Sequence, residues 1–336
     1  MPQQETQPDP SAIISLSTAY WGAQTLLTAN RIGLFEFLGE SAYGLDEVAQ
    51  GLGTDRRATR LLVNACIGLG LVTRVDDQYQ NSPQSQAFLC PGKPGFLGNA
   101  LRYSDDLYPV WTSLEQTLKS GQPALPTADY TGDDEERTRH FVHGMHNRAL
   151  GIGRLLVRLV DLADRASMID VGGGPGTYSC LFARAYPRLK ARVLDLPGVV
   201  RVADEIIAEM GLPERVTAAG FDYLQDEFPG PVDVVLISGV FHRESEATCR
   251  QLIAQAADSL VPGGVLIISD VFTDAGGAQP AFATLFGLNM MITAPDGGVH
   301  ADADVARWMQ EAGFTGTDIR HFPPPMPHRM VIGEKS

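Results

Sequence analysis

The sequence predicts an α/β protein in which a mainly helical N-terminal part is followed by a doubly wound, mostly parallel sheet. Two observations lead to this class. Up to about residue 165 the apolar residues recur at helical spacing, whereas from Ser167 short apolar runs alternate with helical stretches. The 336 residues have room for two domains, and 44% hydrophobic and 20% charged residues are typical of a folded protein.

The N-terminal part begins with a helix that Ser11 is expected to cap, running to about residue 33. Its broad apolar face would pack inside its own domain or form a dimer interface. Residues 45–82 then predict a short helix, a glycine turn, a longer helix starting at Asp55 and a β-hairpin around Asp76 and Asp77. This order is typical of a winged helix-turn-helix.

The charge of the chain argues against the usual role of a winged helix. The sequence has 26 Lys and Arg against 40 Asp and Glu, which gives a net charge of −14 and a pI of about 4.9. Such a balance repels nucleic acid and anionic membranes. No signal-like start, no apolar run of membrane-spanning length and no metal-ligand or disulfide spacing among the four cysteines is present, so we expect a cytoplasmic protein.

Residues 94–165 are expected to be mainly helical, with a surface loop around Pro123 and Pro126. After them the segments predict five strands, each except the third followed by a helix, and then two closing strands. The expected strands lie within 167–174, 191–198, 216–222, 232–242, 263–272, 314–322 and 328–336, with one helix, which includes 303–313, before the closing pair.

The turn after the first of these strands is rich in glycine. Gly172, Gly174 and Gly176 form a GxGxG pattern, and the third glycine of a dinucleotide-binding GxGxxG would fall at Thr177. Asp170, just before the loop, would repel a pyrophosphate but can orient an ammonium group. Asp195 ends the next strand, where a carboxylate accepts hydrogen bonds from ribose hydroxyls. These features favour a nucleoside that carries an amino acid over NAD.

Four segments resemble successive motifs of the S-adenosylmethionine-dependent small-molecule O-methyltransferases, which include acetylserotonin, caffeate and many bacterial natural-product enzymes. The segments are VGGGPGTYSCLFARAYPRLKARVLDLPGVV, GFDYLQDEFP, VVLISGVFHRESEATCRQLIAQAADSLVPGGVLIISDVF and NMMITAPDGGVHADADVARWMQEAGF. The resemblance implies a winged-helix dimerisation domain (1–105), a helical linker that contributes to the substrate pocket (106–165) and a Rossmann-like class I methyltransferase domain with an antiparallel C-terminal strand (166–336).

The same resemblance implies a set of residues for S-adenosylmethionine and its product S-adenosylhomocysteine. The glycine loop would pass under the methionine part, Asp195 would hold the ribose, and Asp222 with Tyr223 would lie at the adenine. Leu196 is a further expected cofactor-binding residue. Ser238 aligns with a polar position near the cofactor carboxylate, and Met145 with a methionine at the cofactor and substrate. Asp222 as a turn residue and Met145 as a core residue remain the alternatives.

His242 aligns with the catalytic histidine of the family, and it follows the fourth strand at the edge where open α/β sheets bind ligands. Asp270 aligns with one acidic partner of that histidine. His300 aligns with the other, where the family commonly has Glu, and Arg243-Glu244 replaces the usual Asp-Trp. Two alternatives stay open for His300: a divalent metal shared with His242 and Asp270, or, as we expect, no metal and a neutral His300 that hydrogen-bonds His242 or the substrate.

These features predict an enzyme that methylates a hydroxyl of a small, partly aromatic metabolite, with His242 as general base. The expected partners are this acceptor and a second copy of the chain. C-, N- or S-methylation is the alternative within the family, and an NAD-dependent oxidoreductase or a ligand-responsive regulator lies outside it. The expected pocket residues are Trp111, Phe141, Phe241, Phe286, Asn289 and Met290.

Overall fold

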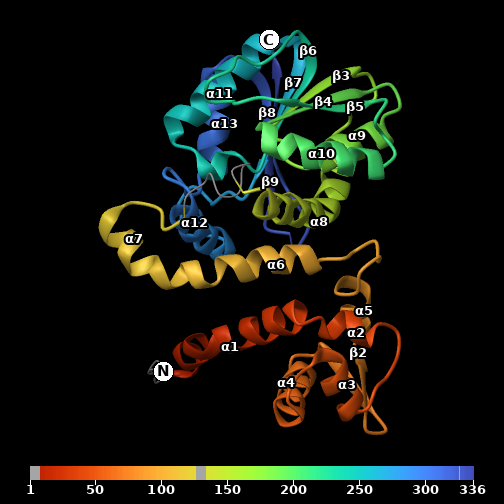
Figure 1. The fold of residues 1–336 in the computed structure, drawn as a ribbon. Helices are drawn as coiled ribbons and strands as arrows, with labels where there is room; N and C mark the ends of the chain where they lie inside the picture. The colour runs from red at the N-terminus through yellow and green to blue at the C-terminus, as the bar shows by residue number, and fades with distance from the viewer. Residues whose placement is uncertain (1–7, 126–133, 325) are drawn as a thin grey trace, which may run out of the picture. The chain divides into compact units, whose positions relative to one another are not determined.

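The computed structural model describes residues 8–125, 134–324 and 326–336, and the chain forms two compact units, Met1–Asp105 and Asp106–Ser336 (Figure 1). The division falls at residue 105, where the sequence analysis ends its first domain. The expected linker 106–165 belongs to the same compact unit as the sheet that follows it. Residues 126–133, which include Pro126 of the expected loop, lie outside the described residues.

The first unit is a winged helix with an added N-terminal helix. Its elements are α1 (Ser11–Arg31), α2 (Leu34–Leu38), α3 (Leu45–Leu52), α4 (Arg56–Gly68), β1 (Val72–Val75), β2 (Gln78–Asn81), α5 (Pro83–Phe88) and most of α6 (Gly98–Leu107). Phe35, Val48, Val63 and Val72 are fully buried and form its core with Tyr79. The predicted fold of this region is confirmed.

Local signals explain two boundaries in this unit and correct a third. The Asp55 carboxylate accepts from Ala58 N (2.9 Å) and caps α4, while Asp76 and Asp77 take the left-handed conformation that a two-residue hairpin turn needs. The prediction that Ser11 caps α1 is wrong. Ser11 is already helical, and its N–H instead donates to the carboxylate of Asp9 (3.0 Å).

The second unit contains a seven-stranded sheet with strand order β5-β4-β3-β6-β7-β9-β8. Its strands are β3 (Ser167–Val171), β4 (Lys190–Asp195), β5 (Val216–Gly220), β6 (Val232–Ser238), β7 (Leu260–Asp270), β8 (Phe314–His321) and β9 (Arg329–Lys335). All pairs are parallel except those of β9, which runs antiparallel to both β7 and β8. The predicted doubly wound sheet with an antiparallel C-terminal strand is confirmed.

Helices cover both faces of this sheet because the inner strands are apolar on both sides. Val235, Ile237, Leu266 and Ile268 pack on one face, toward α11 (Glu246–Ser259) and α13 (Asp302–Glu311). The residues that alternate with them pack on the other, toward α8 (Glu135–Leu159) and α9 (Thr177–Ala185). Figure 1 shows these two helical layers, with α10 (Pro197–Glu209) beside α9.

The region between β7 and β8 differs from the prediction, since it holds two helices rather than one. α12 (Ala281–Thr293) precedes α13, and short elements η1 (Pro109–Ser113) and α7 (Leu114–Ser120) contact α12. The sequence of α12, AFATLFGLNMMIT, is apolar on almost every side, so it has little amphipathic periodicity for a sequence pattern to detect. This missed helix carries several of the expected pocket residues.

The strand order changes direction between β3 and β6, whose carboxyl ends lie side by side at the centre of the sheet. Ligands of open α/β sheets bind at this point. The glycine loop follows β3, and the 3-10 turn η3 (Phe241–Arg243), which carries His242, follows β6. Across the described residues no helix is long and apolar enough to cross a membrane, and all four cysteines are free and buried.

Candidate active site

The glycine loop joins β3 to α9 in a backbone conformation that other residues adopt poorly. Gly172, Gly174 and Gly176 have φ values of 64°, 53° and 69°. A Cβ on Gly172 would lie 2.6 Å from Val240 Cγ2, and one on Gly173 would lie 2.7 Å from the carboxyl carbon of Asp170. Neighbouring side chains therefore leave no room for a Cβ at Gly172 or Gly173, and the positive φ values at Gly172, Gly174 and Gly176 also favour glycine.

Asp170 lies under this loop and is fully buried. Its Oδ2 accepts from Ser179 Oγ (2.7 Å), while no described residue donates to its buried Oδ1. Burial raises the pKa of this carboxyl to about 7. A buried oxygen without a donor is uncommon in a folded protein, so this atom is a position at which a ligand's donor would be favourable.

Asp195 ends β4 beside the loop. Its two carboxylate oxygens accept from Gly174 N (2.7 Å) and Leu196 N (2.8 Å). Burial raises the pKa of this carboxyl to about 6, although these N–H groups and the charge of Arg243 act in the opposite direction. The backbone thus holds Asp195 and Leu196 in place, and each oxygen keeps a lone pair for another donor.

The expected adenine residues lie after β5. Asp222 accepts from Leu224 N (3.0 Å) and Gln225 Nε2 (2.7 Å), and so closes the turn in which it stands. The Tyr223 hydroxyl donates to Glu244 Oε1 (2.8 Å), and burial raises the pKa of Tyr223. This second bond links the loop after β5 to the end of the His242 turn, a connection that the sequence analysis did not include.

Ser238 and Met145 are both half-buried, at the end of β6 and on α8. Ser238 hydrogen-bonds Tyr178, a residue on the first turn of α9 that the sequence analysis missed. His146, the neighbour of Met145, was not among the expected site residues either. Its Nδ1 lies 2.7 Å from the hydroxyl of Thr177, which directly follows the glycine loop. Burial lowers the pKa of His146 to about 4, so this imidazole is neutral. The only sequence feature that points to His146 as a site residue is that it directly follows Met145.

His242 and Asp270 form the closest titratable pair at this edge of the sheet. His242 Nδ1 lies 2.6 Å from Asp270 Oδ1, and the His242 backbone N donates to Asp270 Oδ2 (3.3 Å). Only 14% of the His242 side chain and 2% of the Asp270 side chain is exposed. Burial alone would raise the pKa of Asp270, but His242 and the N–H of Val271 lower it below its ordinary value.

This pairing determines the imidazole tautomer. An ionised Asp270 can only accept, so His242 Nδ1 carries the hydrogen and Nε2 is left as a proton acceptor. The arrangement matches a general base oriented by a carboxylate.

His300 does not join this pair as the sequence analysis expected. Its Nε2 lies 3.1 Å from Phe241 O and 2.9 Å from Glu244 O, so it bonds the backbone of the His242 turn rather than the imidazole. Among the residues that the structure describes, no three His, Cys, Asp or Glu side chains form a group that could hold a metal ion. The shared-metal alternative for His242, Asp270 and His300 therefore has no geometric support.

The expected pocket residues divide into two groups. The Phe286 ring lies edge-on to the His242 imidazole, with ring centroids 4.9 Å apart, and Trp111 Nε1 donates to Asn289 Oδ1 (2.9 Å). By contrast Phe241 and Met290 are buried, Phe241 completely, and Phe141 packs against the apolar cluster between α8 and α10. The side chains of Phe241 and Met290 lie in the interior of this unit, and their place in the substrate pocket stays a prediction.

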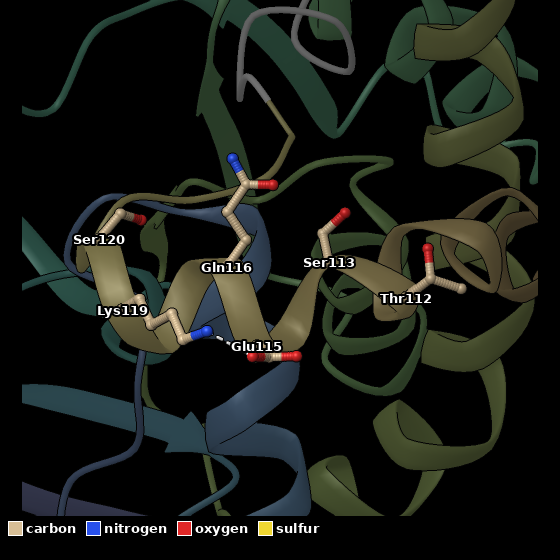
Figure 2. Close-up of a pocket in the computed structure, with 6 residues that line it drawn as sticks. All are labelled: Thr112, Ser113, Glu115, Gln116, Lys119 and Ser120. Carbon is tan, nitrogen blue, oxygen red and sulfur yellow. Dashed lines mark hydrogen bonds and ion pairs between the residues drawn. The ribbon is translucent and has the colours of Figure 1, made fainter.

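A surface pocket elsewhere on this unit contains none of these residues. Figure 2 shows it on η1 and α7, where the Lys119 ammonium and the Glu115 carboxylate form an ion pair. Its other lining residues are Thr112, Ser113, Gln116 and Ser120. Its lining includes no residue of the glycine loop and neither member of the His242–Asp270 pair, so it is not the candidate active site.

The fold and the site together define a Rossmann-like class I methyltransferase with an N-terminal winged-helix domain. Comparison with known proteins agrees with this class. Residues 115–315 match the model of the O-methyltransferase domain, and residues 14–91 match that of the O-methyltransferase dimerisation domain. The chain belongs to the O-methyltransferase family.

Individual relatives cover nearly the whole chain. The tetracenomycin polyketide synthesis 8-O-methyl transferase TcmO of Streptomyces glaucescens is 31% identical over 97% of this chain and 97% of its own. The N,N-dimethyltransferase OxyT of Streptomyces rimosus is also 31% identical, over 90% of each chain. Human N-acetylserotonin methyltransferase, solved in complex with S-adenosylmethionine, superimposes with a TM-score of 0.88 at 22% identity and full coverage of both chains.

Proposed function

We propose that this protein transfers a methyl group from S-adenosylmethionine to a hydroxyl of a small aromatic metabolite, with His242 as general base. The observation that supports this most directly is the His242–Asp270 pair beside the glycine loop. TcmO, which matches 97% of both chains, is named for O-methylation in polyketide synthesis. A relative from Streptomyces sahachiroi, also 31% identical, is named a 3-hydroxy-5-methyl-1-naphthoate 3-O-methyltransferase. The expected acceptor is therefore a phenolic hydroxyl on one or more fused rings.

Several features fit an adenosyl cofactor that carries an amino acid. Gly174 has open space where a side chain would stand, so the loop backbone is accessible there. The buried Oδ1 of Asp170 has no donor among the described residues and suits an ammonium group, and Asp195 offers acceptors for ribose hydroxyls. Gly172, Gly176, Leu196, Asp222, Tyr223, Ser238 and Met145 complete the proposed set around them.

When bound, S-adenosylmethionine supplies a methyl group on a positively charged sulfur, which an oxygen nucleophile can attack directly. The protein must then orient the acceptor and remove its proton. His242 Nε2 takes this proton because Asp270 accepts from Nδ1 and fixes the tautomer. As the imidazole becomes positive, the buried Asp270 carboxylate stabilises it. The edge-on Phe286 ring limits the directions from which an acceptor can approach His242.

The experiment has two steps. Calorimetric titration with S-adenosylhomocysteine should show binding, and methyl transfer is then assayed with a hydroxynaphthoate and with the corresponding aminonaphthoate. We expect transfer to the hydroxyl, and His242→Ala should lower kcat by about 10²–10⁴ with nearly unchanged affinity for S-adenosylhomocysteine. His321→Ala, which removes an exposed histidine on β8, is the matched control.

N-methylation is the second candidate, because OxyT is as similar in identity as TcmO and is named an N,N-dimethyltransferase. An amine that is neutral at the assay pH attacks without prior loss of a proton, and a thiolate or carbanion has already lost it. His242→Ala would then change kcat by less than about tenfold. A near-wild-type rate in this variant therefore argues for N-, S- or C-methylation.

We also propose a homodimer formed through the N-terminal unit. The chain carries the dimerisation domain of its family, and α1 exposes apolar side chains: Ile13 is 75%, Leu16 is 78% and Trp21 is 61% exposed. A monomer rarely leaves so many large apolar residues together on one short segment. Light scattering should report a dimer at micromolar concentration, and Leu16→Asp should weaken it; a wild-type monomer would refute the proposal.

A further inference from the structure

The turn that carries His242 is short and only partly satisfies its own carbonyl groups. Within it Phe241 O accepts from Glu244 N (3.2 Å), which leaves that oxygen one further lone pair for another donor. η3 spans only Phe241–Arg243, so its carbonyls cannot be satisfied as in a longer helix. The segment 298–300 supplies the donors. Gly298 N donates to His242 O (2.9 Å), and His300 Nε2 lies 2.9 Å from Glu244 O and 3.1 Å from Phe241 O.

The chemistry of these partners determines the state of His300. A carbonyl oxygen only accepts hydrogen bonds, so Nε2 must carry a hydrogen, and it donates to both carbonyls. The ring also packs edge-on against Trp308, at 5.3 Å between centroids, and the thiol of Cys249 lies 3.6 Å from Nε2. With Nε2 occupied in this way, this nitrogen of His300 is not available to take a proton from an acceptor.

The backbone of His300 extends the same connection to the strand that carries Asp270. Thr273 N donates to His300 O (2.9 Å), and Thr273 stands three residues after Asp270, beyond the end of β7. His300 therefore bonds the His242 turn through its side chain and the extension of β7 through its main chain. The segments that carry His242 and Asp270 are thus both hydrogen-bonded to His300.

We propose that His300 is a positioning residue that holds the His242 turn by donating Nε2–H to Phe241 O and Glu244 O, so that His242 Nδ1 meets Asp270. This proposal rests on the proposed function of His242 as base. It also reverses the chemistry implied by the family resemblance, in which a Glu occupies this position. A carboxylate has no hydrogen to donate and would face the two carbonyl oxygens with like partial charge.

Variants at His300 separate donation from bulk. His300→Gln keeps an N–H donor on a side chain of similar reach, His300→Ala removes it, and His300→Glu replaces it by an acceptor. We expect His300→Ala to lower kcat about 10- to 100-fold, the scale of a small misplacement of a catalytic group. His300→Gln should recover most of the rate and His300→Glu should not. The dissociation constant of S-adenosylhomocysteine should stay within about twofold in all three, since the side-chain partners of His300 are Phe241, Glu244 and Cys249, which lie outside the proposed cofactor set.

A spectroscopic readout tests the geometry without any acceptor. In the ¹⁵N-labelled full-length protein with bound S-adenosylhomocysteine, the His300 imidazole, assigned by its loss in His300→Gln, should be protonated at Nε2 and unprotonated at Nδ1. A hydrogen on Nδ1 alone would overturn the proposal. So would a His300→Ala protein that remains folded and keeps the wild-type kcat, or a His300→Glu protein faster than His300→Gln.

The outcomes also separate this proposal from the proposed function. If His242→Ala is slow while His300→Ala is as fast as the wild type, only the positioning role fails. If His242→Ala retains the wild-type rate, the base assignment fails and with it the catalytic purpose of His300, whatever the tautomer. His321→Gln is the matched control for the substitution itself, because His321 is exposed on β8.

Discussion

Replacing the carboxylate of Asp195 by an amide, as Asp195→Asn, should weaken cofactor binding and remove its dependence on pH. The two oxygens of Asp195 accept from Gly174 N and Leu196 N at 2.7 and 2.8 Å. An asparagine has a single acceptor oxygen, so one of these N–H groups would face the amide nitrogen. An N–H left unpaired, together with a weaker acceptor for the ribose, costs about 1–3 kcal/mol, or about 5- to 150-fold in dissociation constant.

The pH dependence follows from the raised pKa of Asp195, about 6. Because this pKa is higher in the folded than in the unfolded chain, protonation of Asp195 favours the folded state of the free protein, and that contribution is lost as the pH rises through about 6. A ligand whose hydroxyls donate to Asp195 requires the ionised form. Its affinity should therefore be full above about pH 7 and fall about tenfold for each unit below pH 6.

Calorimetric titration with S-adenosylhomocysteine at several pH values between 5 and 8 measures both effects. In two buffers of different ionisation enthalpy, wild-type binding near pH 6 should release a proton, and binding at pH 8 should not. The Asp195→Asn protein should bind weakly with no such change. Wild-type affinity that is constant between pH 5 and 8 would refute the reasoning. The same pH dependence in the variant would assign the titration to Asp170, whose pKa is about 7.

Three further changes test the site and its support. Asp270→Asn should lower kcat by about 10²–10⁴ with little change in S-adenosylhomocysteine affinity, because the amide no longer stabilises the protonated imidazole; single-turnover methyl transfer measures this. Asp302→Ala removes the carboxylate that pairs with the Arg329 guanidinium at 2.5 Å, and both side chains are at most 13% exposed. Because a buried charge is left without its partner, the free energy of unfolding measured in urea should fall by about 3–5 kcal/mol. Gly173→Ala would place a Cβ 2.7 Å from the Asp170 carboxyl carbon and should lower both the melting temperature and the affinity for S-adenosylhomocysteine, measured by thermal shift and calorimetry.

The parts of the site at strand ends were predictable from the sequence. Asp195, His242 and Asp270 directly follow or end apolar runs, and parallel strands bring such positions to one edge of a sheet. The glycine pattern added the loop between them. The positions of these residues along the chain were enough to predict that they lie together, because each one stands at or just after the carboxyl end of a strand.

The parts that depend on side-chain direction were not predictable. Nothing in the sequence around His300 indicates that its Nε2 faces two carbonyl oxygens, since those belong to a turn more than fifty residues away. Phe241 directly precedes His242 and yet fills the core, because successive residues of a tight turn point in different directions. The α12 helix escaped prediction for another reason: an almost uniformly apolar sequence has no polar face to reveal its period.

The position of β9 in the sheet determines when the sheet can be completed during synthesis of the chain. β9, at residues 329–335, lies between β7 and β8 and supplies the neighbour of Asp270 in the sheet, since Arg329 pairs with it. During synthesis, one edge of the apolar strand β7 therefore has no neighbouring strand, and its backbone groups stay unpaired, until almost the entire described chain has left the ribosome. An unpaired apolar edge is a point of association with other chains. Nascent copies of this protein should depend on chaperones until this strand arrives, and fusions that delay it should increase aggregation.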